Sequence, residues 1–261
     1  MIGLGIVTVL TMLALAAPWI APADPIRGSL PNSLRAPSHA FWLGTDVQGR
    51  DLVSRLLFGA RVSLAVGLVS QTIACFLGVV LGLAAGYYGR WLDALLMRLA
   101  DVTLAFPSLL LLIAIAAAVS PSLPVVFVVI GLVGWAGMAR LVRGEVLALR
   151  VRDHVYAARA LGASDARIVL RHLLPGVLSP VIVAATLGVG GAIMAEAALS
   201  FVGLGAQPPT PSWGAMVADG RDLLRVAPWV SIVPGLAIGL TVLGVNLVGD
   251  GLRDALEVRA T

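Results

Sequence analysis

Few side chains in this sequence are suited to catalysis, and the chemistry that it lacks is informative. All 18 basic residues are arginine, so there is neither a P-loop lysine to bind phosphate nor a lysine for Schiff-base catalysis. The one cysteine, Cys75, excludes an intrachain disulfide. The three histidines, His39, His154 and His172, are scattered along the sequence. We therefore expect no catalytic residue, no bound metal and no cofactor.

The most distinctive polar stretch runs from Ala157 to Pro175 and reads AARALGASDARIVLRHLLP. Its pattern predicts a helix, a sharp turn and a second helix. Gly162 lies where a helix ends in a left-handed residue, a conformation that glycine adopts without steric cost. Ser164 lies at the N-cap of the next helix, with Asp165 in its first turn. A basic element of this shape, held between two apolar segments, is well suited to dock into a partner protein.

The rest of the chain is dominated by apolar segments long enough to cross a membrane. The sequence is 59% hydrophobic and 12% charged, whereas soluble domains contain about 25% charged residues. Uncharged runs occupy 1–23, 62–89, 102–139, 172–195 and 226–249. A span needs about 20 apolar residues, and a turn signal at 120–124 divides the longest run. We expect an all-α integral membrane protein with six spans, at 2–22, 62–86, 102–119, 123–141, 175–199 and 227–248.

The first apolar run is expected to be a retained span rather than a cleaved signal peptide. It has neither a positively charged start nor a clean small-residue cleavage site. The missing basic flank suggests that the natural N-terminus is longer.

Arginine placement predicts the orientation of the spans. Six spans place both termini on one side of the membrane, and residues 140–172 contain seven arginines, at 140, 143, 150, 152, 159, 167 and 171. Because basic loops stay in the cytoplasm, we expect this loop and both termini to be cytoplasmic. Segments 23–61 and 200–226 then face outward. The net charge of +4 fits contact with anionic lipid better than binding to nucleic acid.

Glu196 is the one acidic residue set in an expected span. A charge at membrane depth is costly, so this carboxylate should face protein or water and have a partner. It could contact substrate together with Ser200, form a structural pair near the outer end of the fifth span, or simply be exposed at that end. The aromatic residues near the span ends are expected to anchor the membrane–water interface: Tyr87, Tyr88, Trp91, Trp213 and Trp229.

A second motif follows the first span and reads Gly44-Thr45-Asp46-Val47-Gln48-Gly49-Arg50-Asp51. Thr45 or Asp46 could cap a short helix, with Gly49 in a turn. Apolar positions alternating with polar ones over 51–58 suggest an interfacial amphipathic helix. We expect this motif to brace the outer mouth of a pore, with contact to an external binding protein as the alternative.

With these features in place, the chain resembles a known family. The pattern Ala157-Ala158, then Gly162, then Leu174-Pro175 is similar to the EAA loop of binding-protein-dependent ABC importer permeases. Two positions depart from the family pattern: Tyr156 replaces its glutamate and His172 its isoleucine. In the family, this loop forms a coupling helix that fits a groove on a cytoplasmic ATPase. The resemblance assigns ATPase coupling to Tyr156, Ala157, Ala158, Arg159, Gly162, Ala163, Ser164, Leu174 and Pro175.

Two further stretches narrow the resemblance to one branch of the family. Residues 43–61 resemble the segment after the first span in the dipeptide, oligopeptide and nickel branch. Residues 196–214, which include Glu196-Ala197-Ala198-Leu199-Ser200, resemble the end of the fifth span there. The likeness is greatest to the second, shorter permease subunit. It implies a type I importer fold with a first span at 1–22, a periplasmic segment at 23–60, a core at 61–249 with the coupling loop at 142–174, and a cytoplasmic tail at 250–261.

The resemblance implies a non-catalytic permease subunit in the bacterial inner membrane. Its expected partners are a second, similar permease, two cytoplasmic ATPase subunits or domains, and an extracytoplasmic binding protein. Di- or oligopeptides are the expected substrates, although nickel chelates, glutathione and related solutes are carried in the same branch. The alternatives are an ion-gradient-driven secondary transporter and a membrane enzyme. The transporter would be expected to show more ionisable residues within the spans and discontinuous helices. The enzyme would be expected to show clustered His, Asp or Glu at a membrane face. Neither alternative explains the stretch 157–175.

Overall fold

Long apolar runs without internal turn signals form long helices in this protein. The computed structural model describes residues 1–257, and this part of the chain is helical apart from loops and one isolated bridge between Thr45 and Asp51. The helices are α1 (Ile2–Ile20), α2 (Leu52–Tyr88), α3 (Arg90–Ala105), α4 (Ser108–Ala117), α5 (Leu123–Leu149), α6 (Asp153–Ala160), α7 (Asp165–Ile168), α8 (Leu174–Phe201), α9 (Trp213–Gly220) and α10 (Trp229–Glu257). Short 3-10 turns occupy Leu30–Asn32 and Arg221–Leu223.

Five continuous helical segments are long and apolar enough to cross a membrane. They are α1, α2, α5, α10 and the helix running from Asp165 to Phe201. The bent pair of α3 and α4 raises the number to six if it is taken as one broken span. The expected all-helical membrane fold is therefore confirmed. The expected break at 120–124 is also present, since α4 ends at Ala117 and α5 begins at Leu123.

The third span differs from the sequence prediction. A single helix was expected at 102–119, but α3 and α4 meet at a bend of 93°. Pro107 explains the break, because it lacks an N–H and disfavours helical geometry at the residue before it. Phe106 accordingly has extended backbone angles, with φ −85° and ψ 140°. Helix α4 has ten residues, about 15 Å of helix, and is too short to cross the hydrocarbon alone.

Two other predicted boundaries fall inside continuous helices. Helix α2 begins at Leu52, so the helix expected near 51–58 is continuous with the second span, and the expected boundary at 60/61 lies within α2. Helix α10 likewise continues to Glu257. The predicted cytoplasmic tail at 250–261 is thus partly helical, and its residues 258–261 lie outside the described residues.

The fifth span begins earlier than expected. The predicted start was residue 175, but helix runs from Asp165 through α7, a π-helical turn η2 (Val169–Leu173) and α8. Pro175 explains the wider turn, because its ring clashes with the carbonyl four residues earlier and it donates no hydrogen bond. The helix continues past the proline with its hydrogen bonding shifted instead of stopping there.

Helices α2 and α5 form the centre of the bundle, packed closely along their length. Glycines on α2 allow this approach. A Cβ added at Gly82 would lie 2.6 Å from the Ala139 carbonyl oxygen and 2.7 Å from the Val142 Cβ. No side chain larger than hydrogen fits there without a shift, so small residues set the distance between the two helices.

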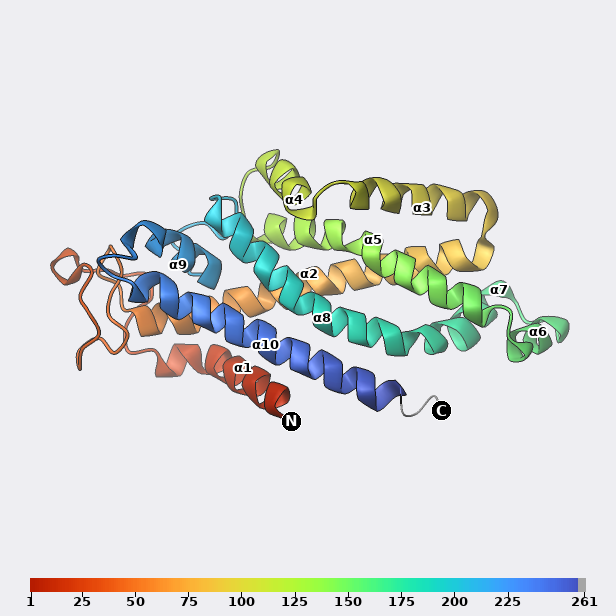
Figure 1. The fold of residues 1–261 in the computed structure, drawn as a ribbon, viewed down its shortest axis with the longest axis horizontal. Coiled ribbons are helices and arrows are strands. Elements are labelled where there is room, and N and C mark those ends of the chain that lie inside the picture. The colour runs from red at the N-terminus through yellow and green to blue at the C-terminus, as the bar shows by residue number, and fades with distance from the viewer. Residues whose placement is uncertain (258–261) are drawn as a thin grey trace.

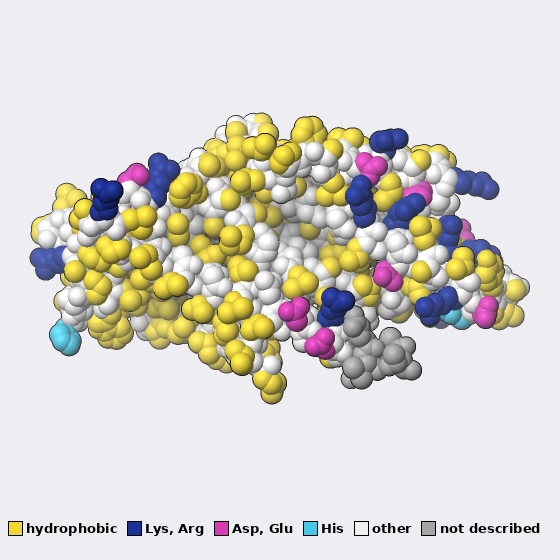
Figure 2. All heavy atoms as spheres, in the orientation of Figure 1, with side chains coloured by type: hydrophobic (Ala, Val, Ile, Leu, Met, Phe, Trp, Pro, Cys, Tyr) yellow, Lys and Arg dark blue, Asp and Glu magenta, His cyan; other side chains and the backbone are white. Residues whose placement is uncertain are grey.

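The expected functional segments lie at opposite ends of an elongated molecule. Figure 1 shows the segment between α1 and α2 together with α9 at one end, and α6 and α7 at the other. Figure 2 shows hydrophobic side chains across the middle of this face, while arginine side chains gather toward the two ends. Helix α2 joins the two ends with 37 residues, about 55 Å of helix.

Candidate functional sites

The loop between α5 and α8 contains the helix–turn–helix element that the sequence predicted. Helix α6 ends at Ala160, and Gly162 has a φ of +80°. The Gly162 N–H donates to the Arg159 carbonyl, and the Ala163 N–H donates to the Ala158 carbonyl, each at 3.0 Å. These two bonds form a Schellman motif, which requires a left-handed residue at the glycine position. The predicted role of Gly162 as the residue that ends the helix is confirmed.

Ser164 occupies the predicted N-cap position of α7, and Asp165 lies in the first turn. However, the Ser164 side chain makes no capping hydrogen bond. The turn is held instead by backbone bonds, including the Ile168 N–H to the Ser164 carbonyl at 3.0 Å. Of the predicted coupling residues further on, Leu174 is half-buried and Pro175 is exposed at the start of α8.

The coupling loop has one face packed into the bundle and one face open. Val155, Ile168 and Leu173 are fully buried in a core cluster with residues of α2 and α5. In contrast, Tyr156 is 54% exposed and Leu161 is 88% exposed. Exposed large apolar side chains at the end of a loop, above a rigid core, are typical of a docking surface. The loop can therefore receive a partner without losing its own packing.

At the opposite end of the molecule, the motif at 44–51 is folded inward. Thr45 is buried, and its hydroxyl accepts from the Arg35 N–H at 2.8 Å and donates to the Asn32 carbonyl at 2.5 Å. The Trp229 indole N–H donates to the Thr45 carbonyl at 3.2 Å. A Cβ at Gly44, whose φ is +80°, would lie 2.7 Å from that indole nitrogen. The motif thus fixes the segment between α1 and α2, which we call the outer segment after its predicted side of the membrane, to α10.

The same motif supplies the N-cap of α2 and the turn before it. Asp51 is the N-cap residue, and its carboxylate accepts from the Ser54 N–H at 2.7 Å and the Ser54 hydroxyl at 2.8 Å. The capping residue expected from sequence was Thr45 or Asp46, so this expectation was wrong by several residues. Gly49 has a φ of +70° and forms the expected turn. Asp46 stabilises that turn by accepting from the Gln48 and Arg50 N–H groups, each at 2.9 Å.

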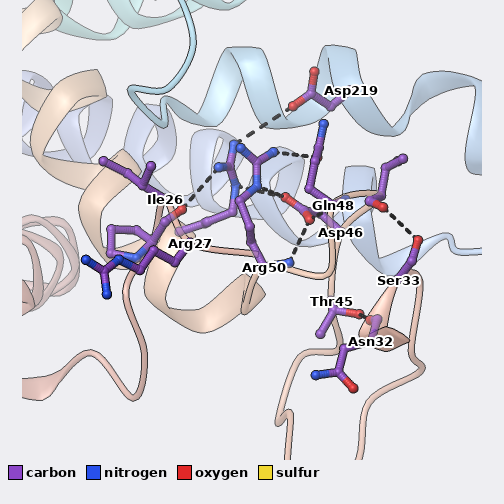
Figure 3. Close-up of polar contacts among 12 residues, drawn as sticks. Ile26, Arg27, Asn32, Ser33, Thr45, Asp46, Gln48, Arg50 and Asp219 are labelled. Atoms are coloured by element: carbon purple, nitrogen blue, oxygen red, sulfur yellow. Dashed lines mark hydrogen bonds and ion pairs between the residues drawn. The ribbon is translucent and has the colours of Figure 1, made fainter. Parts of the chain in front are cut away.

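A buried ion cluster joins the outer segment to two helices. The Asp46 carboxylate accepts from Arg50 at 2.6 Å and pairs with Arg55 at 3.3 Å, and all three side chains are nearly inaccessible. Figure 3 shows Asp46, Gln48 and Arg50 gathered at one place, with Asp219 approaching from a separate helix. That helix is α9, and its Asp219 lies 3.9 Å from Arg55. Partial burial raises the pKa of the Asp219 carboxyl above its ordinary value, and the positive charge of Arg55 opposes the shift.

Arg50, Arg55 and Asp219 also line a pocket of about 260 Å³ at this end of the molecule. The loop 203–210 and α9 close its other sides. Since two buried guanidinium groups share the one carboxylate of Asp46, the cluster fixes the relative positions of the outer segment, α2 and α9.

Comparison with known proteins assigns the chain to a family. The model of the family described as binding-protein-dependent transport system inner membrane component matches residues 78–261. The chain belongs to this family. A dipeptide transport system permease protein of Alkalihalophilus pseudofirmus is 47% identical over 98% of this chain and 84% of its own length. A putative peptide transport system permease protein of Brucella suis is 45% identical over 99% of this chain and 87% of its own.

Two further comparisons agree with that assignment. A glutathione transport system permease protein of Pectobacterium atrosepticum is 48% identical over 85% of this chain and 73% of its own length. Among solved structures, the fold is similar to a chain of a methionine ABC transporter in an inward-facing conformation, with a TM-score of 0.63 and 21% identity, covering 77% of this chain and 95% of that chain. This permease is therefore a multi-pass protein of the bacterial inner membrane. The comparisons give no support to the ion-gradient-driven alternative.

Glu196 of the permease is fully buried in α8. One carboxyl oxygen accepts from the Ser200 hydroxyl at 2.7 Å and from the Ser212 hydroxyl at 2.8 Å. Ser212 is the N-cap of α9, where its hydroxyl also accepts from the Ala215 N–H. Glu196 therefore connects α8 to α9. It reaches no solvent in this conformation, and contact with substrate would require α8 and α9 to separate.

Several contacts of the permease were not expected from sequence. Trp213 was expected at the membrane interface, but its side chain is buried and its indole N–H donates to the Leu56 carbonyl at 3.0 Å. His154 and His172, which are separate in the sequence, lie with ring centroids 6.2 Å apart. The Tyr87 hydroxyl donates to Asp165, 78 residues away. None of these pairs has a local sequence signal, because each depends on how separate helices pack.

Proposed function

We propose that this permease forms half of the translocation pore of an ATP-driven importer of di- or oligopeptides or related solutes. The observation that carries the proposal is the coupling loop: a Schellman turn at Gly162 sets the exposed helix α6 on a buried base. The relatives at 45–48% identity are named for dipeptide, peptide or glutathione transport. A second, similar permease completes the pore, and an external binding protein delivers the substrate.

The proposed topology follows from the arginine-rich loop. Residues 140–172 lie in the cytoplasm together with both termini, and the outer segment faces the periplasm. The predicted coupling residues Tyr156, Ala157, Ala158 and Arg159 all belong to α6. In this topology α6 meets the ATPase, and the small side chains of the two alanines let the backbones approach closely. ATP binding and hydrolysis occur in separate subunits, and the permease itself is non-catalytic.

The outer motif and Glu196 are proposed to have structural roles. The motif at 44–51 braces the outer mouth, since Thr45 and Asp46 are buried and bonded to the bundle. Glu196 and Ser200 hold α9 against α8 through Ser212. Burial of all three side chains favours this role over direct contact with the substrate.

The proposal is tested by purifying tagged permease from its native membranes in mild detergent, as wild type and as Gly162→Pro. We expect an ATPase and a second permease to co-purify with the wild type. Proline cannot adopt the left-handed φ and removes the N–H that donates to Arg159, so the variant should stay inserted but lose the ATPase. Recovery of wild-type permease alone, with transport in proteoliposomes that needs no ATP, would contradict the proposal.

A further inference from the structure

The inner end of α2 contacts the coupling loop through polar side chains. The Tyr87 hydroxyl donates to the Asp165 carboxylate at 2.5 Å. The guanidinium carbon of Arg159 lies 5.9 Å from the centroid of the Tyr87 ring, within the range of a cation–π contact. At the residue before Tyr87, the Gly86 carbonyl accepts from the side chain of Arg150, which follows the end of α5, at 2.9 Å. The last turn of α2 is thus joined to three positions in the loop region.

These contacts lie on both sides of the glycine turn. Arg159 is in the last turn of α6, and Asp165 is in the first turn of α7. A single ring, that of Tyr87, therefore contacts both helices that meet at Gly162. Because α7 continues through η2 into α8, the same ring also connects the inner end of α2 to the start of the fifth span.

Apolar packing beneath these contacts holds the loop against the bundle. Val155 of α6 and Ile168 of α7 are fully buried, in one cluster with Leu83 of α2 and Val146 of α5. The buried side chains fix the distance between the loop and the bundle. They are non-directional, so the orientation of α6 relative to α7 depends on directional contacts, which are the backbone bonds of the Gly162 turn and the contacts of Tyr87.

We propose that Tyr87 is a positioning residue for coupling, which holds α6 and α7 at a fixed angle and joins them to α2. When the ATPase displaces α6, this contact moves the inner end of α2 with it. Helix α2 runs without a break to the ion cluster at the outer end, where Arg55 pairs with Asp46. The inference rests on the proposed function, because it needs an ATPase docked on α6.

The test uses the complete transporter in proteoliposomes, with both permeases, the ATPases and the binding protein. The readout is the ratio of ATP hydrolysis with binding protein to hydrolysis without it. Tyr87→Phe removes the hydroxyl and keeps the ring. Since the hydrogen bond is to a carboxylate but partly solvated, we expect this ratio to fall about fivefold. Tyr88→Phe is the matched control: Tyr88 is 55% exposed and contacts the Tyr87 ring edge-on, and its variant should keep the wild-type ratio.

Variants of the acceptor separate a positioning role from a merely structural one. Asp165→Asn keeps an oxygen that can accept from Tyr87 and should stay within twofold of wild type, whereas Asp165→Ala should match Tyr87→Phe. The double variant Tyr87→Phe/Asp165→Ala should be no worse than either single variant, because both remove the same contact. Thermal unfolding and the amount of co-purified ATPase should be unchanged in all of them.

The outcomes that overturn the inference are distinct from failure of the proposed function. A wild-type ratio in Tyr87→Phe, or additive losses in the double variant, would show that Tyr87 does not position the loop. A lower ratio of ATP hydrolysis that is accompanied by loss of bound ATPase or of thermal stability would show that Tyr87 has only a structural role. If the wild-type permease binds no ATPase at all, the proposed function itself fails.

Discussion

Replacement of Gly162 by alanine isolates the contribution of one backbone angle to the coupling loop. A Cβ at this position would meet no atom within 4 Å, so the substitution causes no steric overlap. The φ of +80° is the one obstacle. Gly144 in α5 is the matched control, because a Cβ there also meets nothing within 4 Å and its helix is continuous.

The expected magnitudes have opposite signs at the two positions. A left-handed conformation costs an L-residue about 1–2 kcal/mol, and the reduced freedom of the unfolded chain returns about 0.4–1 kcal/mol. Gly162→Ala should therefore destabilise the turn by about 1 kcal/mol. In a regular helix the same change stabilises by about 0.5–1 kcal/mol. Gly162→Asn should lie nearer to wild type than alanine, since asparagine tolerates left-handed angles.

Hydrogen exchange measured by mass spectrometry on peptides covering 155–168 would detect the change. A loss of about 1 kcal/mol predicts roughly fivefold faster exchange in Gly162→Ala, concentrated at the two amides of the Schellman motif. The peptide containing Gly144 should exchange no faster in Gly144→Ala. Equal exchange rates at 155–168 in wild type and Gly162→Ala would refute the reasoning, because the backbone angle would then carry no cost.

Three further substitutions test the ion cluster, the buried carboxyl and the helix packing. Asp46→Ala leaves two buried arginines without their shared carboxylate and should lower the free energy of unfolding by about 3 kcal/mol. Asp24 is exposed, so Asp24→Ala should change that free energy little. Equal effects of the two variants on thermal unfolding would contradict a bracing role for the cluster. Glu196→Gln keeps an acceptor for the two serine hydroxyls, so its thermal unfolding and its transport rate should resemble those of the wild type. Loss of transport with unchanged thermal unfolding would instead indicate substrate contact. Gly82→Ala overpacks the α2–α5 contact and should cost about 2 kcal/mol. Gly137→Ala, in α5 with no atom within 4 Å of its Cβ, should instead stabilise by about 0.5–1 kcal/mol, like Gly144→Ala. Similar melting temperatures for both variants would show that the two helices adjust freely.

The two ends of the molecule use different physical means to hold their positions. The outer segment relies on buried ions and on hydrogen bonds from side chains such as Thr45. The inner loop relies on an apolar base with exposed helices above it. A buried ion pair resists separation because each charge would be left uncompensated, whereas an apolar contact allows sliding at lower cost. Under the proposed function, this difference would suit a fixed outer mouth and an inner loop that the ATPase displaces.

Sequence alone determined the features that depend on neighbouring residues. The membrane class follows from the uncharged runs. The spans could be counted because a segment in lipid must form all its backbone hydrogen bonds internally, so each long apolar run forms a helix. Gly162 could be placed in a left-handed turn, since the residues that make a Schellman motif are adjacent in the chain. The break at Phe106–Pro107 also had a local signal, the proline itself, but the bend of 93° depends on where α4 packs.

Only the tertiary structure decided which distant residues meet. The contacts of Tyr87 with Asp165 and of Glu196 with Ser212 join separate helices, and the partners are set by the rotation and depth of each helix in the bundle. Apolar periodicity restricts that rotation weakly in a membrane protein, because side chains facing lipid and side chains facing protein are both apolar. Polar partners and close glycine contacts specify the arrangement, and these become apparent only once the helices are packed.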